Sequence, residues 1–300
     1  MTKVVEKCIG TAFSVSAIPV LKDNYTYIIH DRITNTLAAV DVSDDFTPVL
    51  DYIKHLTNTK TSLNSTTTPE FRTILSTHKH WDHAGGNTKL PQHVQQANGT
   101  FRIIGGVNDK VPGATETVRE GDKLMIGALQ VEVLDTPCHT KGHVMYKVYH
   151  PQDINDGCAL FTGDTMFIGG IGAFFEGNAA DMCRALKKVY HLNKNNKNEK
   201  NSEAADNHTF IFPGHEYTVN FLKFTCATLP STHPDAAFVA AQLERYKKSV
   251  AQHKPTVPST LAEEKLQNLF LRTCDEKFIR GMNHGTTPEA LMQYLYNSCP

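Results

Sequence analysis

The segment Thr77-His78-Lys79-His80-Trp81-Asp82-His83 brings three histidines and one aspartate together within a few residues. It follows the apolar run 71–76, which has the pattern of a buried strand. It precedes residues 84–87, where a loop is expected to turn into a short helix within 85–96. Imidazole and carboxylate are the ligands that suit zinc and neighbouring metals. The segment therefore predicts a metal site. It holds more ligands than one tetrahedral ion needs, so we expect two ions side by side.

Three further candidate ligands each follow an apolar run of their own. His139 follows residues 131–138, Asp164 follows residues 158–163, and His215 follows residues 210–214. Apolar runs of this length are typical of buried strands, so four strands would deliver ligands to one rim of a sheet. The alternative for residues 77–83 is a polar loop that is rich in histidine by chance, and the downstream candidates argue against it.

The spacing of these ligands resembles the metallo-β-lactamase superfamily and, within it, the glyoxalase II (hydroxyacylglutathione hydrolase) family. Segments 23–25, 136–140, 161–165, 213–217 and 256–261 also resemble motifs of that family, so the resemblance covers most of the chain. It implies an α/β fold in the form of an αββα sandwich, followed by a helical domain. Helical patterns at 45–57 and 179–192 that flank a strand-rich region favour the same architecture.

The domain boundary is expected after His215, where the pattern changes. Helices are predicted at 217–229, 235–253, 260–268 and 288–297, the last with Thr287 as N-cap and Pro288 in its first turn. We therefore expect residues 1–216 to form the αββα domain that carries the metal ligands. Residues 217–300 are expected to form a helical substrate-binding domain.

The resemblance implies how the ligands divide between two divalent ions, which are expected to be zinc, iron or a mixed pair. One ion takes His78, His80 and His139, the other takes Asp82, His83 and His215, and Asp164 bridges them. Asp82 and Asp164 are the expected catalytic residues, Asp82 because it positions the second metal. A water shared by two cations loses its proton near neutral pH, and the resulting hydroxide can attack a thioester carbonyl.

Four nearby features leave alternatives open. Asp41 ends an apolar run, and the resemblance implies that it orients the ligand loop, although a plain strand-end role is the alternative. His143 is a rival ligand that we expect in a structural hydrogen bond instead. Cys138 could be a nucleophile, but a buried small side chain is favoured. Residues 169–172 lack the Lys-Ser/Thr ending of a phosphate-binding P-loop and are interpreted as a substrate-approach loop.

The expected substrate contacts depart from the glutathione-specific pattern of the family. They are Ile171, Ala173, Phe175, Tyr217, Phe221, Phe224, Tyr296 and Cys299. That pattern has a basic residue two positions before a tyrosine, where this chain has Ala173 and Phe175, and a C-terminal Arg and Lys, where this chain has Tyr296 and Cys299. A glycine carboxylate would lose charge-assisted hydrogen bonds worth ~1.5–3 kcal/mol each.

A thiol whose glycine is amidated by a polyamine has no such carboxylate. The substitutions therefore resemble the trypanosomatid branch of the family and predict hydrolysis of S-D-lactoyltrypanothione to D-lactate and free thiol, a step of methylglyoxal detoxification. The glutathione thioester is the alternative. A mononuclear iron persulfide dioxygenase shares the fold but would bind one metal and consume oxygen. A β-lactamase would lack the helical C-terminal part, and a non-catalytic thiol-binding protein would lack some of the ligands.

The composition of the chain limits the classes of partner that the protein is expected to bind. The chain has 300 residues, a formal net charge of −1 and seven cysteines at scattered positions. This charge argues against a nucleic-acid surface, and no apolar run reaches the ~18 residues that span a bilayer. The odd cysteine count argues against a disulfide framework. The first residues lack a signal-peptide core. We therefore expect a cytoplasmic monomer that acts on a small-molecule thioester and binds neither nucleic acid nor membrane.

Overall fold

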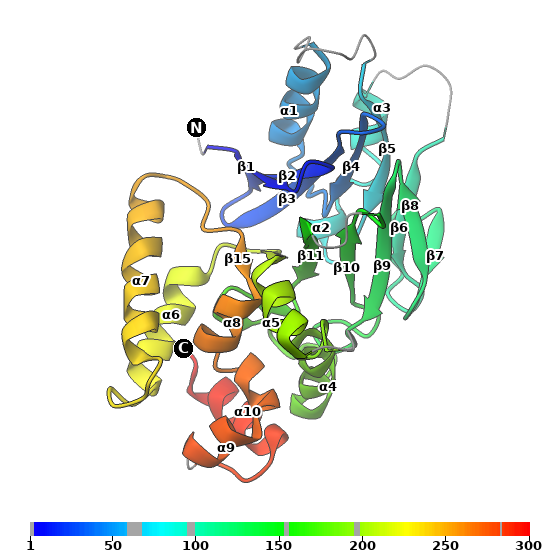
Figure 1. The fold of residues 1–300 in the computed structure, drawn as a ribbon. Coiled ribbons are helices and arrows are strands. Elements are labelled where there is room, and N and C mark those ends of the chain that lie inside the picture. The colour runs from blue at the N-terminus through cyan, green and yellow to red at the C-terminus, as the bar shows by residue number, and fades with distance from the viewer. Residues whose placement is uncertain (1–2, 59–67, 95–99, 153–155, 195–198, 283) are drawn as a thin grey trace.

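Two β-sheets lie face to face between two layers of helices (Figure 1). This computed structural model describes residues 3–58, 68–94, 100–152, 156–194, 199–282 and 284–300. The predicted αββα sandwich with a helical C-terminal region is confirmed. The predicted domain boundary after residue 216 stays a prediction.

The first sheet has seven strands in sequence order. They are β1 (Val5–Ile9), β2 (Phe13–Val20), β3 (Asn24–Asp31), β4 (Thr36–Val40), β5 (Glu70–Leu75), β6 (Arg102–Gly106) and β7 (Glu116–Val118). Strands β1 to β4 pair antiparallel, and β4 to β7 pair parallel. Parallel neighbours place the carboxyl ends of β4, β5 and β6 at one edge. The histidine-rich segment leaves β5 at this edge.

The second sheet has six strands in the order β15-β14-β11-β10-β9-β8. They are β8 (Lys123–Ile126), β9 (Leu129–Asp135), β10 (Val144–Tyr149), β11 (Cys158–Gly163), β14 (Thr209–Pro213) and β15 (Ser259–Thr260). β11 runs parallel to β14, and β10 runs antiparallel to both β9 and β11. Strands β9, β11 and β14 therefore end at the same edge. His139, Asp164 and His215 follow these three ends.

The core follows the two-residue repeat of the strands. Ile29 faces the second sheet in the larger apolar cluster, whereas its neighbour Ile28 packs on the other side with Val49 and Ile53 of α1 (Thr47–Asn58). Adjacent strand residues point to opposite faces, so one run of apolar residues serves both layers. The first sheet is thereby buried on both faces and holds the β5 end rigidly.

Helices of the second half cover the other side of the sandwich (Figure 1). They are α4 (Ala179–Tyr190), α5 (Glu199–Asn207), α6 (Thr218–Thr228), α7 (Ala236–Ala251), α8 (Leu261–Gln267), the 3₁₀ helix η2 (Leu271–Cys274), α9 (Glu276–Met282) and α10 (Pro288–Ser298). Thr287 caps α10 as predicted, because its side chain accepts from the Ala290 N–H. No described helix is both long and apolar enough to cross a membrane.

Two features of this half differ from the sequence prediction. Helix α9 was not predicted. The low-complexity composition of residues 193–208 predicts a solvated insertion. Part of this run folds as α5, whose Asp206 pairs with Lys265 of α8; residues 195–198 lie outside the described residues. The polar run 57–69, whose composition predicts an exposed loop, is also largely outside them.

Candidate metal centre

The seven predicted metal ligands meet at the shared carboxyl edge of the two sheets. Their ligand atoms form three groups in which all atoms lie within 4.8 Å of one another: His78, His80 and His139; His78, His83 and Asp164; and Asp82, His83 and His215. The first and third groups are the two sets that the resemblance implied. The second group joins them through Asp164. These clusters are consistent with a binuclear metal site.

Asp164 lies between the two outer groups. Its Oδ2 is 3.4 Å from Nε2 of His139 and 3.3 Å from Nε2 of His215, and its Oδ1 is 3.4 Å from Nε2 of His83. The carboxylate is almost fully buried. One carboxylate therefore faces ligands of both groups, which is the geometry that a bridging ligand requires.

Asp82 and His83 lie on a helix rather than on the loop that the sequence predicted. Residues Trp81–Ala84 form the one-turn helix α2, with His80 at its N-cap. The His83 N–H donates to the His80 carbonyl oxygen at 3.0 Å. The turn of this helix points Asp82 and His83 at His215, with which they form the third group. His78 and His80, which precede the helix, belong to the first group. A second short helix, α3 (Leu90–His93), follows α2 and lies within the segment 85–96 where a helix was predicted.

Hydrogen bonds select the tautomers of His83 and His215. Nδ1 of His83 donates to Oδ2 of Asp41 at 3.1 Å, and Nδ1 of His215 donates to Oδ1 of Asp23 at 2.9 Å. Ionised carboxylates only accept, so each neutral ring keeps a lone pair on Nε2. The two Nε2 atoms lie 3.2 Å apart. Facing lone pairs at this distance repel each other unless a cation lies between them.

The first group is oriented in the same way. Nδ1 of His139 donates to the Ala173 carbonyl oxygen at 3.0 Å. The Thr77 hydroxyl donates to Asp41, so its oxygen accepts from Nδ1 of His78 at 3.1 Å. Both rings therefore turn an Nε2 lone pair toward Nδ1 of His80, at 3.1 Å and 3.0 Å. At most one of these two lone pairs can accept a proton from His80.

The electrostatics of the two groups differ. Burial lowers the pKa of His78 and of His139, which keeps these rings neutral and available as ligands. Burial also opposes charge on His215, but the negative charge of Asp164 and hydrogen bonds to Asp164 and Asp82 raise its pKa to about 10. For His83, burial is likewise outweighed by Asp164, and the pKa is raised well above its ordinary value. Surroundings that attract a proton so strongly also favour a metal cation.

Two further observations fit a bound metal. Oδ1 of Asp164 is buried without a hydrogen-bond partner among the described residues, although an orphaned carboxylate oxygen is costly. A side chain at Gly214 would place its Cβ 2.3 Å from that Oδ1 and 2.7 Å from the His83 ring. The glycine thus keeps the space at the carboxylate free. The nitrogen and oxygen donors present match zinc and its neighbours.

Asp41, which accepts from His83 of the third group, also contacts the ligand loop. Asp23 accepts from His215 of the same group. Oδ1 and Oδ2 of Asp41 also accept from the backbone N–H and the hydroxyl of Thr77, each at 2.7 Å. Asp41 has a positive φ of 56°, so its backbone is held in the left-handed region. The structure thus places Asp41 against the ligand loop, as the resemblance implied.

Two residues near His139 had alternative roles in the sequence analysis: His143 as a metal ligand and Cys138 as a nucleophile. Nδ1 of His143 lies at hydrogen-bond distance from the Thr136 and Thr165 hydroxyls, and its Nε2 accepts from the Asp164 N–H at 3.1 Å. His143 belongs to none of the described ligand groups. Cys138 is buried, and burial raises the pKa of its thiol to about 12. A thiol in this state is not an activated nucleophile.

Sequence reasoning missed three groups that orient the ligands. Asp23 holds His215, Nδ2 of Asn24 donates to Oδ2 of Asp82 at 2.9 Å, and the Ala173 carbonyl holds His139. Residues 23–25 resembled a family motif, which was a signal for the first two. The Ala173 carbonyl is a backbone group, so the residue type at this position gives no signal of its role.

The eight predicted substrate contacts lie in different surroundings. Phe175 is 68% exposed, with its ring centroid 5.0 Å from that of His139. The Tyr217 ring stacks on His215 at 4.9 Å, and the Phe221 ring stacks on Phe167. Phe224 is buried against Phe270 in the core. The remaining four are a buried Ile171 and the half-buried Ala173, Tyr296 and Cys299.

A ring stack occupies the place where the family pattern has a cation. The Tyr296 ring lies 3.9 Å from that of Phe174 with an interplanar angle of 10°, and the Tyr296 oxygen accepts from the Phe174 N–H at 3.2 Å. This contact ties α10 to the segment that contains Ala173 and Phe175. The C-terminal helix is therefore anchored beside the metal centre by aromatic packing.

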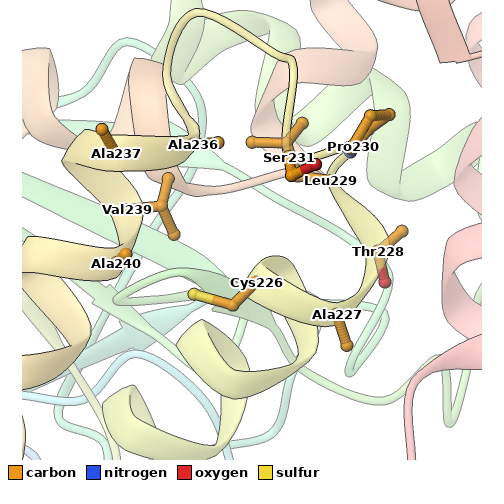
Figure 2. Close-up of a pocket in the computed structure, with 10 residues that line it drawn as sticks. All are labelled: Cys226, Ala227, Thr228, Leu229, Pro230, Ser231, Ala236, Ala237, Val239 and Ala240. Atoms are coloured by element: carbon orange, nitrogen blue, oxygen red, sulfur yellow. The ribbon is translucent and has the colours of Figure 1, made fainter.

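Two pockets lie at different distances from the ligands. One, of about 600 Å³, is lined by Lys79, Asn108, Asp109, Lys110, Lys141, Phe175 and Glu176, and it adjoins the centre through Lys79 and Phe175. The other, of about 630 Å³, lies between the end of α6 and α7 and is lined by Cys226, Leu229, Val239 and small residues (Figure 2). No predicted ligand lines the second pocket, so it is separate from the metal centre.

Comparison with known proteins gives a consistent result. A family model described as "Hydroxyacylglutathione hydrolase C-terminus" matches residues 216–297. "Hydroxyacylglutathione hydrolase cytoplasmic" of Arabidopsis thaliana is 37% identical over 256 residues, which cover 85% of this chain and 86% of that protein. "Hydroxyacylglutathione hydrolase" of Dictyostelium discoideum is 33% identical over 258 residues, with 86% and 85% covered.

A solved structure shares the fold. The metallo-β-lactamase from Staphylococcus aureus superposes with a TM-score of 0.58 at 16% identity and covers 97% of this chain and 70% of that chain. At this identity the similarity concerns the fold alone.

Proposed function

Because the chain belongs to the hydroxyacylglutathione hydrolase (glyoxalase II) family of the metallo-β-lactamase superfamily, we propose that it hydrolyses the thioester of a 2-hydroxy acid, releasing the acid and a free thiol. The observation that carries this proposal is the convergence of three His/Asp groups at one edge of the sandwich. Two divalent ions held there would supply an activated water and polarise the thioester carbonyl.

The chain's own residues would hold and orient this centre. His78, His80 and His139 form one set of ligands, Asp82, His83 and His215 form the other, and Asp164 faces both. Asp23, Asp41 and the Ala173 carbonyl hold three of the imidazoles in the tautomer that leaves Nε2 free. Asp82 and Asp164 are the carboxylates closest to the reaction in this proposal.

Tyr217 is suited to contact the substrate. Its ring stacks on the ligand His215, and its hydroxyl donates to Asp23 at 3.4 Å. Burial and the neighbouring Asp23 charge raise the pKa of this hydroxyl, so it stays protonated and able to donate. Because this hydroxyl donates to Asp23, its oxygen can accept from an amide N–H of the thiol carrier.

The comparisons favour glutathione as the thiol carrier over trypanothione, which the sequence analysis put first. Both relatives are named hydroxyacylglutathione hydrolases. The pocket beside Phe175 adds support, because three lysines, Lys79, Lys110 and Lys141, line it beside the two acidic residues Asp109 and Glu176, and the surplus of positive charge can receive a carboxylate. The glutathione thioester is therefore our first candidate.

Trypanothione remains the second candidate because of one specific observation. Around Phe174, the contacts are Tyr296 and neighbouring apolar side chains rather than the cations of the glutathione-specific pattern. An amidated glycine would meet no unpaired charge there. Ile171, Phe221 and Cys299 are further apolar candidates for contacts with a polyamine chain.

A comparison of kcat/KM for the D-lactoyl thioesters of the two thiols tests this proposal. A glutathione preference supports the first candidate, and a trypanothione preference supports the second. If the metal-loaded protein cleaved neither thioester nor any other 2-hydroxyacyl thioester, the hydrolase proposal would be overturned.

We also propose a cytoplasmic, monomeric protein that acts on a small molecule. The name of the Arabidopsis relative supports the location. Size-exclusion chromatography with light scattering would test the monomer.

A further inference from the structure

A buried carboxylate of the C-terminal half contacts the loop that follows the metal ligand Asp164. Glu264 of α8 is fully buried and accepts four hydrogen bonds. Oε2 accepts from the Gly169 N–H at 2.8 Å and from Nδ2 of Asn268 at 3.2 Å. Oε1 accepts from the Ser259 hydroxyl at 2.7 Å and from Nε2 of Gln267 at 2.7 Å. Burial raises the pKa of Glu264, while all four partners donate and so favour its ionised form.

Asn268, which follows α8, binds the same loop at two further backbone positions. Its Nδ2 donates to the carbonyl oxygens of Phe167 and Gly170, at 3.2 Å and 3.0 Å. Its Oδ1 accepts from the N–H groups of Phe270 and Leu271 at 3.1 Å. Every polar atom of the Asn268 amide group is thus engaged, and the side chain has no freedom to turn away from the loop.

The loop that these residues hold is short and weakly self-supported. It is a hairpin of β12 (Met166–Phe167) and β13 (Gly170–Ile171), which pair over only two residues each. Gly169 at its turn has a φ of 76°, a conformation that favours glycine. Two-residue strands are marginal alone, so hydrogen bonds from α8 contribute a large share of the order in this hairpin.

Both ends of the hairpin carry parts of the metal centre. Asp164 precedes it, and the Ala173 carbonyl that accepts from His139 follows it. Between them, Gly172 approaches so closely that an added Cβ would lie 1.9 Å from the Asp164 carbonyl oxygen and 3.2 Å from Nδ1 of His139. The Phe167 ring also meets the His215 ring edge-on at 5.8 Å. A shift of the hairpin would therefore move groups that touch ligands of both sets.

We propose that Glu264 and Asn268 are positioning residues for the metal centre, acting through the backbone of residues 167–170. In this role the helical C-terminal region supports the metal centre as well as the substrate site, because α8 fixes the bridging carboxylate and the orientation of His139. The inference rests on the proposed function only in treating residues 78–83, 139, 164 and 215 as metal ligands.

The test compares Glu264→Gln with Glu263→Gln. Glu263 lies next to Glu264 on α8, is half-buried, and caps the same helix by accepting from the Thr260 N–H at 2.9 Å, but it makes no described contact with the hairpin. Loss of either carboxylate weakens α8, whereas only Glu264→Gln alters the hold on Gly169. The Glu263 variant thus controls for helix stability.

We expect Glu264→Gln to weaken zinc affinity by about 10- to 100-fold, as loss of a group that orients a ligand typically does. Affinity would be measured by competition with a chromophoric chelator. Cobalt-substituted protein should show an altered visible spectrum, and the amides of residues 167–170 should exchange faster in the metal-free variant. The kcat should fall more than KM changes. Glu263→Gln should keep the wild-type affinity, spectrum and exchange.

Wild-type zinc affinity and cobalt spectrum in Glu264→Gln would overturn the proposal, and so would an equal loss in Glu263→Gln. If Glu264→Gln does not fold, Asn268→Ala decides the same question, because Glu264 keeps its other three donors. The metal readouts do not depend on which thioester is cleaved. An inactive wild-type protein with the expected metal effects would reject only the proposed hydrolase function.

Discussion

Nε2 of His83 and Nε2 of His215 lie 3.2 Å apart, although 132 residues separate them in the chain. Both rings donate from Nδ1 to a carboxylate, Asp41 in one case and Asp23 in the other. With both rings neutral, the two Nε2 lone pairs face each other and repel. The raised pKa of each ring shows that this point attracts positive charge, which a proton or a divalent cation would supply.

Removal of metal should abolish thioester hydrolysis reversibly. Dialysis against a chelator should yield inactive protein, and zinc should restore activity as about two ions bind per chain, since two ligand sets share Asp164. Elemental analysis and activity would be followed together. One iron per chain with uptake of oxygen would instead favour a persulfide dioxygenase.

Loss of a ligand should remove activity without unfolding the chain. Asp164→Ala or His80→Ala should lower kcat/KM by at least about 1,000-fold, because removal of a single oxyanion-stabilising donor already costs ~10²–10³. Far-ultraviolet circular dichroism would check the fold. Full activity in either variant would remove the proposed mechanism.

A ligand-orienting carboxylate should matter almost as much for metal retention. Asp23→Ala removes the acceptor of the His215 Nδ1–H, so zinc affinity should fall by about 10- to 100-fold. The matched control is Asp51→Ala on the exposed side of α1, which should leave affinity unchanged. Equal affinities in wild type and Asp23→Ala would show that His215 needs no such partner.

Cations introduced on α10 should change the preferred thiol. Tyr296→Arg combined with Cys299→Lys should raise kcat/KM for the glutathione thioester by about 10-fold or more, since one charge-assisted hydrogen bond contributes ~1.5–3 kcal/mol. Tyr296→Phe, which keeps the stack on Phe174, is the control for loss of the hydroxyl. An unchanged ratio between the two thioesters would contradict the specificity argument.

Cys138 should prove dispensable for chemistry. Cys138→Ala should keep kcat within about twofold while lowering stability by ~1 kcal/mol, because a small buried side chain is shortened. Activity and thermal unfolding would be measured in parallel. Peptide mass spectrometry of the wild-type protein should show Cys138 resisting alkylation at neutral pH, because burial raises its thiol pKa to about 12, whereas the exposed Cys8 and Cys226 react. A large loss of kcat with an intact metal content would reinstate a nucleophilic role.

The sequence was most informative where side-chain type and period agree. The apolar runs 71–76, 131–138, 158–163 and 210–214 predicted strands, which the structure shows as β5, β9, β11 and β14. The metal-ligand candidates that follow these runs lie together at the ends of those strands. Helix α2 escaped prediction because four residues carry no period. Helix α9 escaped because its seven residues include Gly281, a poor helix former.

Contacts between distant segments were the part that sequence could not supply. Asp23 meets His215 across 192 residues. The backbone hydrogen bonds from the Tyr25 N–H to the Gly214 carbonyl at 2.9 Å and from the Glu216 N–H to the Asp23 carbonyl at 2.7 Å bring the two segments together. From the sequence, Glu264 and Asn268 are ordinary residues of a predicted helix. Only the structure shows that they bind the backbone of residues 167–170. Phe224 could not be told from a substrate contact, because burial against Phe270 depends on helix packing.

The ligands of each set come from both sheets: residues 78–83 follow β5 of the first, whereas His139, Asp164 and His215 follow strands of the second. A bound ion therefore spans the seam between the two halves of the sandwich and can form its full coordination only after they have closed. Its binding free energy then adds to the free energy that keeps the halves shut. A metal-free chain should therefore unfold more readily, and be cut faster by proteases, than the same chain loaded with metal.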